Sequence, residues 1–451
     1  MRVLHVPFTY FPDPVGGTEV YVRQLARALV RHGIESEVAA PCDGEDAKYE
    51  IDGVPVYRYA VGGAGTVEEI YGDGSAEAAT AFARVLRQSR PDVVHLHAFT
   101  RGVSLGVARV ALDAGCRLIY TYHTVTASCL RGDLLLHGVN VCDGEMIVAR
   151  CVSCVLGDLG LPTPGRQLLA RVGPSASRSM GSVLPRGPAA TAIRMPELVA
   201  LRHGSFRRLV EGAERVVAVS AWVRALLLRN GVPEGKLVLS RHGTTAAPLP
   251  RRGRTGPALP LRLAMLGRLD PSKGIHILLE ALRADPGLPV HIDVYAVQQA
   301  GTGAYEARIR AMVAAEPRVR LLPPVPSDDV VPMLAEYDLV AVPSEGMETG
   351  PLTVLEAFAA GIPAIGSRLG GIAELVRDGV DGLLVPRRSP AAWLAALRRL
   401  VHEPDLLPAL CAGISVPRSM DLVGADMAAV YLADGSIDVA AAAPFAEQAP
   451  R

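Results

Sequence analysis

Two runs of alternating strand-like and helix-like segments constrain the fold of this chain more than any other feature. In the first run, β-branched stretches predict strands at residues 2–6, 37–40, 54–59, 93–96, 117–122, 216–219 and 237–240. Amphipathic stretches between them predict helices at 18–32, 76–88, 104–114 and 221–230. Alternation of this kind favours a parallel sheet with helices on both faces.

A second run of the same kind begins at residue 261. Its predicted strands are 261–266, 290–295, 319–321, 339–342 and 363–365, and its predicted helices are 274–283, 305–315, 327–336, 352–360, 373–376 and 390–402. Together the two runs predict an α/β protein of two Rossmann-like, doubly wound domains that face one another across a cleft. In such folds, ligands bind at the carboxyl ends of the strands.

Changes in composition place the domain boundaries. We expect a first domain at 1–246, a linker at 247–260 that is rich in proline, arginine and glycine, and a second domain at 261–415. We interpret residues 416–432 as a C-terminal helix that crosses back to the first domain. Residues 433–451 are expected to form a mobile tail.

Residues 161–208 interrupt the alternation with many proline, glycine and serine residues. From Arg166 to Arg208 there are eight arginines and one acid, Glu197. We expect a flexible basic insertion on the first domain. One interpretation is a site for a phosphorylated lipid acceptor or an anionic membrane, and the other is a solvated loop.

The totals narrow the class of protein. A formal net charge of +0 and an aromatic content of 5% argue against a nucleic-acid-binding surface. The N-terminus has no signal-peptide pattern, and no apolar run is long enough to span a membrane. We therefore expect a cytoplasmic protein, with peripheral contact to the inner face of a membrane as a further expectation.

The segment from Glu348 to Glu356 has the most informative pattern in the second domain. Glu348 follows a predicted strand, and Glu356 falls inside the next predicted helix, with Gly350 and Pro351 at the turn between them. Proline suits the first helical position, and free N–H groups at a helix start hold anions. One carboxylate would then face a sugar and the other a pair of ribose hydroxyls. The alternative is a capped core helix with two solvated carboxylates.

A second segment offers positive charge for a diphosphate. Arg268 and Lys273 flank a glycine-bounded turn between a strand and a helix, and Lys273 is one of only three lysines in the chain. Cations at this spacing can converge on a diphosphate. The alternative is two solvated surface cations.

Two features of the first domain are weaker when each is taken alone. Gly16 and Gly17 open the first helix, where glycines let a backbone approach a phosphate. His123 ends a strand on the expected cleft side, where it could contact a sugar or an acceptor. An ordinary turn and a structural histidine are the alternatives. His95 and His97, at another strand end, have a weaker case.

Read together, these segments resemble the retaining glycosyltransferases of family 4, which have the GT-B fold. The resemblance runs in order along nearly the whole chain. It follows the residues Gly16, Gly17, His123, Val219, Ser220, Gly267, Arg268, Lys273, Glu348, Glu356, Gly370, Gly371, Glu374 and Gly379 to Val385. One departure is His242 before Gly243, where many relatives have asparagine, and we assign His242 no role.

The resemblance implies a role for each matching residue. It implies that Arg268 and Lys273 neutralise the donor diphosphate and that Glu348 and His123 contact the transferred sugar. It further implies that Glu356 binds the ribose and that Gly16 and Gly17 close over the phosphate. Sugar or phosphate contacts are implied for the backbone of Thr349, Gly350, Pro351 and Leu352.

Four cysteines lie within 26 residues in the first domain, spaced x12, x8 and x2: Cys129, Cys142, Cys151 and Cys154. Thiols in a reducing compartment argue against disulfides, and the close final pair suits a structural zinc site. Four thiolates leave no open position on the metal, so catalysis at this site is not expected. The alternative is a set of buried or unpaired thiols.

The function predicted from these features is transfer of a sugar from a nucleotide-diphosphate sugar, UDP- or GDP-linked, to a hydroxyl. The resemblance implies retention of configuration. The chain has no Asp-x-Asp, so we expect no metal bridge to the diphosphate and no catalytic cofactor. The acceptor would be a small molecule, a glycan or a lipid-linked sugar. Two alternatives stay open here: a nucleotide-sugar epimerase and a non-catalytic zinc-knuckle binding protein.

Overall fold

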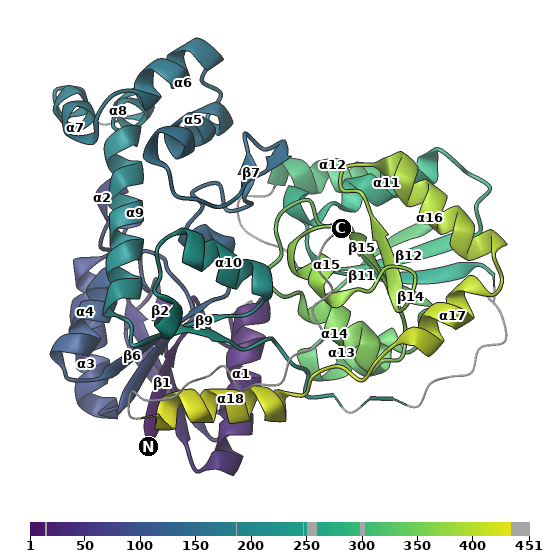
Figure 1. The fold of residues 1–451 in the computed structure, drawn as a ribbon, viewed down its shortest axis with the longest axis horizontal. Coiled ribbons are helices and arrows are strands. Elements are labelled where there is room, and N and C mark those ends of the chain that lie inside the picture. Colours follow the sequence, from purple (N-terminus) through teal and green to yellow (C-terminus); the bar gives the residue numbers. More distant parts are fainter. Residues whose placement is uncertain (14–15, 186, 247, 250–258, 298–302, 434–451) are drawn as a thin grey trace.

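The computed structural model describes residues 1–13, 16–185, 187–246, 248–249, 259–297 and 303–433, and shows two lobes side by side (Figure 1). The first lobe is built on an eight-stranded sheet of order β10-β9-β6-β5-β1-β2-β4-β3. Its strands are β1 (Arg2–Val6), β2 (Glu35–Cys42), β3 (Ala47–Ile51), β4 (Val54–Ala60), β5 (Val93–Leu96), β6 (Arg117–Tyr122), β9 (Arg215–Ala218) and β10 (Leu237–Leu239). Its short apolar strands are buried, as parallel strands covered on both faces must be.

One strand of this sheet, β3, was not predicted from the sequence. It pairs antiparallel with β4 at the sheet edge, and Lys48 and Glu50 on it are exposed. Helices α1 (Gly17–Leu29), α2 (Val67–Tyr71), α3 (Ala76–Ser89), α4 (Leu105–Asp113) and α10 (Ala221–Arg229) connect the strands. Two hydrophobic clusters, one containing Leu4 and the other Val3, fill the two sides of the sheet.

The second lobe has a six-stranded sheet of order β13-β12-β11-β14-β15-β16, and every neighbouring pair is parallel. Its strands are β11 (Leu261–Arg268), β12 (Val290–Val297), β13 (Val319–Leu322), β14 (Leu339–Val342), β15 (Ala364–Ser367) and β16 (Gly382–Val385). Its helices are α11 (Ile275–Arg283), α12 (Gly303–Ala314), α13 (Val330–Leu334), α14 (Leu352–Ala359), α15 (Gly370–Leu375), α16 (Pro390–His402) and α17 (Leu406–Gly413). The α/β prediction of two doubly wound domains is confirmed by these two sheets. Strand β16 and helix α17 were missed.

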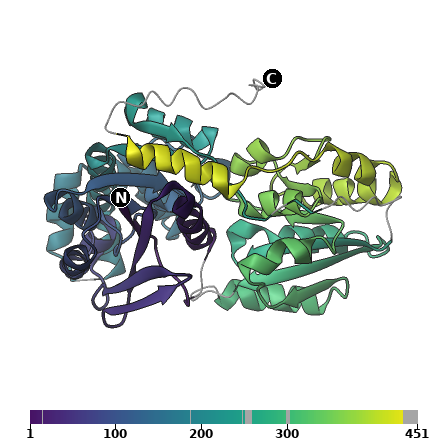
Figure 2. The same cartoon turned by 90° about the horizontal axis from the view of Figure 1, so that it is seen from below.

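The last helix, α18 (Met420–Leu432), packs on the first lobe. It lies along α1, and Val423, Met427 and Tyr431 share a buried cluster with Val22 and Leu25 of α1 (Figure 2). The chain thus returns to the first lobe after completing the second. The expected tail at 433–451 lies outside the described residues, except for Ala433.

The prediction of a flexible insertion at 161–208 is wrong. This stretch forms α6 (Thr163–Ala170), α7 (Pro174–Ser182), α8 (Pro188–Ile193) and most of α9 (Met195–Gly212). Helices α6 and α9 pack against α5 (Val148–Asp158), and α7 and α8 pack against α9 (Figure 1). All four helices have proline in their first turn, where its fixed backbone angle starts a helix instead of breaking it. Buried Met195, Leu198 and Phe206 anchor α9.

Two arginines of this stretch serve the packing of the helices and not an exposed basic surface. Arg202 is buried, and its guanidinium donates to the carbonyls of Phe99 and Thr126 at 2.8 and 2.9 Å. Arg194 pairs with Glu197 at 2.8 Å. Arginines of this segment therefore take part in holding the helices in place. Among the described residues, no helix combines the length and the apolar character needed to cross a membrane.

Candidate active site

The carboxyl ends of β11 and β14, which are neighbours in the second sheet, bring Lys273 and Glu348 together. Lys273 Nζ lies 2.6 Å from Glu348 Oε1, and Ser344 Oγ donates to the same oxygen at 2.8 Å. Burial pushes the pKa of Glu348 up, but the Lys273 ammonium outweighs it and the pKa lies below its ordinary value. Arg268, at the end of β11, adds a smaller effect in the same direction. The site therefore holds an ionised carboxylate beside two cations.

The start of α14 lies next to this pair. Pro351 occupies the position before the first helical residue, Leu352, and no side chain caps the helix. The predicted start of this helix at residue 352 agrees with the structure, and Pro351 lies in the turn before it. An uncapped helix start presents backbone N–H groups and a partial positive charge to an anion.

Glu356 lies on the second turn of α14. Burial raises its pKa from an ordinary value of 4.5 to about 7. The structure thus places a carboxyl, whose pKa no charged neighbour lowers, on the turn that follows the uncapped helix start. A carboxyl of this kind suits a ligand that supplies hydroxyl donors.

The Gly16–Gly17 turn of the first lobe reaches the same helix. A Cβ on Gly17 would lie 3.6 Å from Leu352 Cδ1, so the turn and the start of α14 are in near contact. Buried Glu19 supports the turn by accepting from the Gly16 N–H at 2.9 Å. The glycines leave the backbone at this approach uncovered by side chains.

Backbone groups between the two glutamates contact the first lobe. Thr349 Oγ1 donates to the His123 carbonyl at 2.6 Å, and His242 Nδ1 donates to the Gly350 carbonyl at 2.9 Å. A Cβ on Gly350 would lie 2.8 Å from His242 Nδ1, which explains why glycine is needed there. His242, to which no role was assigned from the sequence, is therefore part of the contact between the lobes.

Four buried histidines form a hydrogen-bonded row that ends at this contact. His242 Nε2 lies 3.3 Å from His123 Nδ1, His123 Nε2 lies 3.0 Å from His97 Nδ1, and His97 Nε2 lies 3.1 Å from His5 Nδ1. His242, His123 and His97 follow β10, β6 and β5, and His5 lies near the end of β1. The row is a direct product of parallel strands whose carboxyl ends meet at one edge.

The Gly350 carbonyl fixes the direction of the row. A carbonyl only accepts, so His242 carries its proton on Nδ1, and each neighbour in turn must do the same. Burial lowers the pKa of His242 to about 4 and that of His5 to about 3, so the rings are neutral near pH 7. Burial also holds His97 and His123 well below the ordinary pKa. The bare nitrogen at the far end, His5 Nε2, is buried without a partner.

The same region contains three histidines with ligand atoms within 4.8 Å of one another, His5, His95 and His97, the one such set of three among the described residues. His95 already bonds the Tyr431 hydroxyl at 2.6 Å and Thr121 Oγ1 at 2.7 Å. Since His97 uses both nitrogens in the row, we interpret this set as a hydrogen-bonded network and not as a metal site.

Comparison with known proteins decides the family. The model of the glycosyl transferase 4-like domain matches residues 16–243, and that of glycosyl transferases group 1 matches residues 260–403. The chain belongs to the group 1 glycosyltransferases. Between them the two matches include every residue that the resemblance assigned to the active site, from Gly16 to Glu356. They favour the transferase over the epimerase and the zinc-knuckle binding protein.

Similar proteins agree with this family. The D-inositol 3-phosphate glycosyltransferase of Thermobispora bispora is 28% identical over 414 residues, which is 88% of this chain and 84% of that protein. Anabaena HepE in complex with UDP and glucose is similar in structure, with a TM-score of 0.63 and 16% identity over 95% of this chain and 99% of that one. Sucrose-phosphate synthase from Thermosynechococcus elongatus gives a TM-score of 0.65 at 18% identity, covering 96% of this chain and 98% of that one. The GT-B fold of this glycosyltransferase is thereby confirmed.

Two further side chains of the glycosyltransferase hold the lobes together beside Glu348. Trp222 Nε1 donates to the Glu348 carbonyl at 3.2 Å. Glu374 of α15 accepts from the N–H groups of Ala221 and Trp222 at 2.9 and 2.6 Å, and so caps α10 of the other lobe. No sequence pattern pointed to Trp222, and Glu374 was named only through the resemblance.

Glu345, the other acid before α14, is used differently. It is buried and pairs with His276 Nε2 at 2.7 Å and with Arg388. Its partners lie within the second lobe, so it supports the loop that carries Glu348. The structure thus separates two acids that lie three residues apart in the sequence.

The four clustered cysteines of the first lobe line one small cavity of about 30 Å³: Cys129, Cys142, Cys151 and Cys154. Burial raises the pKa of Cys151 to about 12, and charge on the neighbouring Cys129 and Cys142 thiols adds to the rise. Disulfides are absent among the described residues, which include all seven cysteines. The fold therefore gathers thiols that are up to 25 positions apart in the sequence.

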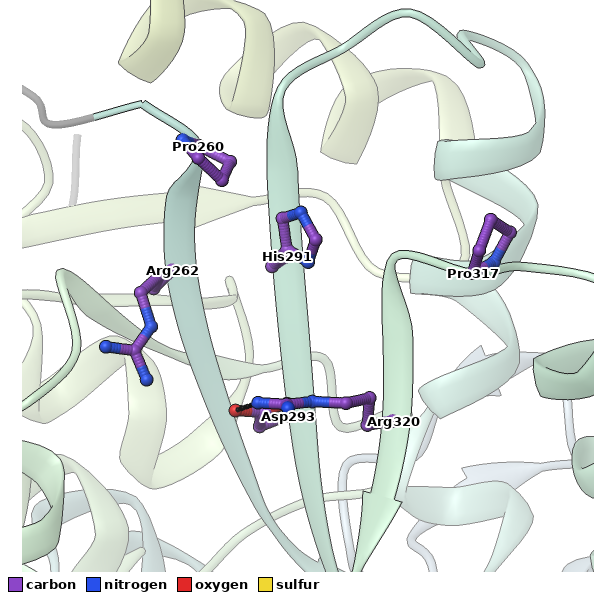
Figure 3. Close-up of a pocket in the computed structure, with 6 residues that line it drawn as sticks. All are labelled: Pro260, Arg262, His291, Asp293, Pro317 and Arg320. Atoms are coloured by element: carbon purple, nitrogen blue, oxygen red, sulfur yellow. Dashed lines mark hydrogen bonds and ion pairs between the residues drawn. The ribbon is translucent and has the colours of Figure 1, made fainter.

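A larger cavity of about 340 Å³ lies at the opposite edge of the second sheet (Figure 3). It is lined by Arg262, His291, Asp293 and Arg320 at the amino halves of their strands and by two prolines. Asp293 pairs with Arg320 at 2.7 Å, and Arg262 stacks on Tyr337. Because Rossmann-like sheets bind ligands at the other strand ends and these charges are already satisfied, we do not assign this cavity to the reaction.

Proposed function

We propose that this glycosyltransferase transfers a sugar from a nucleoside-diphosphate sugar to a hydroxyl acceptor with retention of configuration, without a metal at the diphosphate. The observation that carries the proposal is the 2.6 Å contact between Lys273 and Glu348 beside the uncapped start of α14. This places cations, backbone N–H donors and a carboxylate within one small region.

The hard step is departure of the nucleoside diphosphate, because negative charge grows on its outer phosphate. Arg268 ends β11 and Lys273 lies in the turn that follows it, and the start of α14 follows Glu348, the partner of Lys273, in the chain. Fixed donors of this kind lower the barrier without having to reorganise, by about 3 kcal/mol each. Lys273 would exchange part of its contact with Glu348 for a phosphate oxygen when the donor binds.

The two glutamates would then bind the two sugars of the donor. Glu348, ionised and held by Lys273, accepts from hydroxyls of the transferred sugar. Glu356, whose pKa is raised to about 7, accepts from the two ribose hydroxyls after it loses its proton. We assign Gly16 and Gly17 to the approach over the phosphate, and the backbone of Thr349 to Leu352 to contacts with sugar or phosphate.

His123 is proposed to contact the transferred sugar on its reacting side. Both of its ring nitrogens are engaged in the histidine row. A contact with a sugar hydroxyl therefore requires His123 Nδ1 to exchange the bond to His242 for a bond to the sugar. Such an exchange would couple donor binding to the contact between the lobes.

Retention is supported by the state of the bases near the site. Glu348 is paired with Lys273, and His123 and His242 are neutral with both nitrogens bonded. With these groups engaged, the departing phosphate oxygen is the base best placed to take the acceptor proton, which implies attack on the same face of the sugar. The sugar keeps its configuration in that case.

The names of similar proteins suggest where to begin with substrates. The HepE structure holds UDP and glucose, and the Thermobispora relative is named for D-inositol 3-phosphate. We propose UDP- or GDP-sugars as donors. The acceptor is a small molecule, a glycan or a lipid-linked sugar, as in polysaccharide, glycolipid or natural-product glycoside synthesis, and a phosphorylated cyclitol is a suitable first candidate.

The deciding experiment measures nucleoside diphosphate release with and without acceptor candidates, using the donor that gives the largest thermal shift. We expect release that depends on acceptor, is unchanged by EDTA, and yields a product whose anomeric proton shows the donor configuration by NMR. Inverted product would contradict the same-face mechanism. Loss of activity with EDTA and recovery with Mg²⁺ would contradict the metal-independent diphosphate site.

Helices α6 and α7 support the proposal of peripheral membrane contact. Leu168 and Val183 are 67% and 81% exposed, and the exposed Arg171 and Arg178 lie on or next to the same helices. Apolar side chains beside cations suit an anionic lipid surface. Flotation with vesicles of anionic and of neutral lipid tests this: we expect binding to the anionic vesicles that weakens with salt, and none after Leu168→Glu with Arg171→Glu. Equal recovery with both vesicle types would contradict it.

A further inference from the structure

The cysteine cluster of the first lobe is outside the reaction and is built from three separate elements. Cys129 follows the short turn η2 (Val125–Ala127), Cys142 follows β8 (Asn140–Val141), and Cys151 and Cys154 lie on consecutive turns of α5. All four line the same cavity of about 30 Å³. Convergence of four thiols from three elements requires an explanation beyond packing.

The size and lining of the cavity suit one ion. A cavity needs roughly 10–15 Å³ to admit one water, so this one has room for a single ion or one or two waters. Apart from the four thiols, half of the lining residues are leucine or valine, and the rest are Ser128, Gly144, Arg131, Glu145 and Arg150. Soft thiolate ligands favour Zn²⁺ over hard cations.

The backbone around the cavity donates to sulfur. The His137 N–H lies 3.1 Å from Cys154 Sγ, and the Gly144 N–H lies 3.5 Å from Cys142 Sγ. Donors directed at sulfur stabilise the thiolate, which is the form that binds metal. Two of the four sulfurs are thus already placed as acceptors.

The loop between Cys129 and Cys142 also contains backbone strain. Leu134 and His137 have φ of 53° and 52°, in the left-handed region that side chains other than glycine rarely adopt. The small β7 (Leu135–Leu136)–β8 ribbon that they flank has only two residues in each strand, so a cross-link at its base would offset the strain.

We infer that Cys129, Cys142, Cys151 and Cys154 bind one structural Zn²⁺ ion. No three of the four sulfurs lie within 4.8 Å of one another, because in the described part of the chain only the three histidines form such a set. The thiols therefore surround the cavity at a wider spacing than a zinc site has. Zinc at about 2.3 Å from each sulfur would turn the side chains inward as each thiol gives up its proton. Arg131 and Arg150 would face the resulting net negative charge.

The ion would have a consequence for the donor site. The backbone carbonyl of Asp133, in the same loop, accepts from the Met347 N–H at 3.1 Å. The Cβ of Asp133 is 3.5 Å from the position that a Cβ on Gly346 would occupy. Met347 directly precedes Glu348. The zinc-held loop would therefore position the segment that carries the sugar-binding glutamate. The metal site does not depend on the proposed donor chemistry, whereas this consequence does.

Metal content of the full-length protein tests the site directly. We expect about one zinc per chain by elemental analysis in the wild type and in Cys411→Ser, and less than about 0.1 in Cys151→Ser and in Cys154→Ser. Cys411, in α17 of the other lobe, is the matched control. Less than about 0.1 zinc in a wild-type protein from zinc-supplemented cells would overturn the inference, as would zinc retained by both variants.

X-ray absorption at the zinc edge keeps the test decisive if the variants do not fold. We expect four sulfur neighbours at about 2.3 Å in the wild type. Nitrogen neighbours would instead assign the metal to His5, His95 and His97 and overturn the inference. For the consequence, chelation should lower the melting temperature and weaken donor binding. A lower melting temperature with unchanged donor binding would overturn the positioning role and leave the metal site standing.

Discussion

The raised pKa of Glu356 predicts that donor binding depends on pH in a defined way. In the free protein burial raises this pKa to about 7, so the carboxyl is about half protonated at pH 7. Two ribose hydroxyls that donate to the carboxylate favour the ionised form. Binding must therefore release the proton, and the apparent dissociation constant scales as one plus ten to the power of the pKa minus the pH.

The magnitude follows from the pKa. Relative to the limiting affinity, binding should be about 11-fold weaker at pH 6, twofold weaker at pH 7 and nearly unaffected at pH 8, which is about a tenfold change in all. Proton release should fall from about 0.9 per donor at pH 6 to about 0.1 at pH 8. The free energy of unfolding of the free protein falls as the pH rises. Between pH 4.5 and about 7 the native state holds this proton and the unfolded state does not, so the stability that the proton contributes is lost as the pH rises through about 7.

Calorimetry with an intact nucleotide sugar in buffers of different ionisation enthalpy measures both quantities. The sugar form is needed because a terminal phosphate titrates near pH 6 itself. Glu356→Gln should bind more weakly at pH 8, show no pH dependence, and raise the melting temperature of the free protein there. Glu403→Gln is the matched control, since Glu403 pairs with Arg399 on the surface. Wild-type affinity that is flat from pH 6 to pH 8, or pH dependence that survives in Glu356→Gln, would refute the assignment.

Three further predictions test other contacts. Lys273→Ala and Arg268→Ala should each lower kcat about 100-fold in acceptor-dependent turnover, with Lys48→Ala as the control, and a loss of only a fewfold in both would contradict the leaving-group account. His242→Phe leaves the Gly350 carbonyl and a His123 N–H without a partner and should cost about 1–3 kcal/mol in urea unfolding, whereas an unchanged midpoint would show that water replaces the imidazole. Gly243→Ala places a Cβ 2.6 Å from the Ser419 backbone and should lower the melting temperature more than Gly44→Ala, which has no atom within 4 Å, and equal effects would contradict the close approach.

The sequence predicted most of the two sheets because buried parallel strands are continuous apolar runs. Residues 2–6 and 93–96 were placed at their observed bounds. Strand β3 escaped because an exposed edge strand has no such run. The helices at 163–212 escaped because proline was interpreted as a breaker, although at the first turn of a helix it acts as a start.

Candidate site residues could be proposed from the sequence where charge and spacing lie in one segment, as for Glu348 and Glu356. The histidine row could not, because His5, His97, His123 and His242 come from strands whose order in the sheet is not a sequence property. The raised pKa of Glu356 was also beyond reach, since it depends on how deeply α14 packs. The family resemblance supplied the order of the motifs, and the structure supplied their contacts.

The return of the chain to the first lobe has a mechanical consequence. The outgoing and returning segments are bonded to each other, because the Thr244 N–H donates to the Arg418 carbonyl at 2.9 Å and the Met420 N–H donates to the Thr244 carbonyl at 3.0 Å. Two separate connections would act as two anchors and resist rotation, whereas two that run together act as one hinge line. We therefore expect the lobes to open mainly by rotation about this line, and Gly243 is the point on it where the two backbones come too close for a side chain.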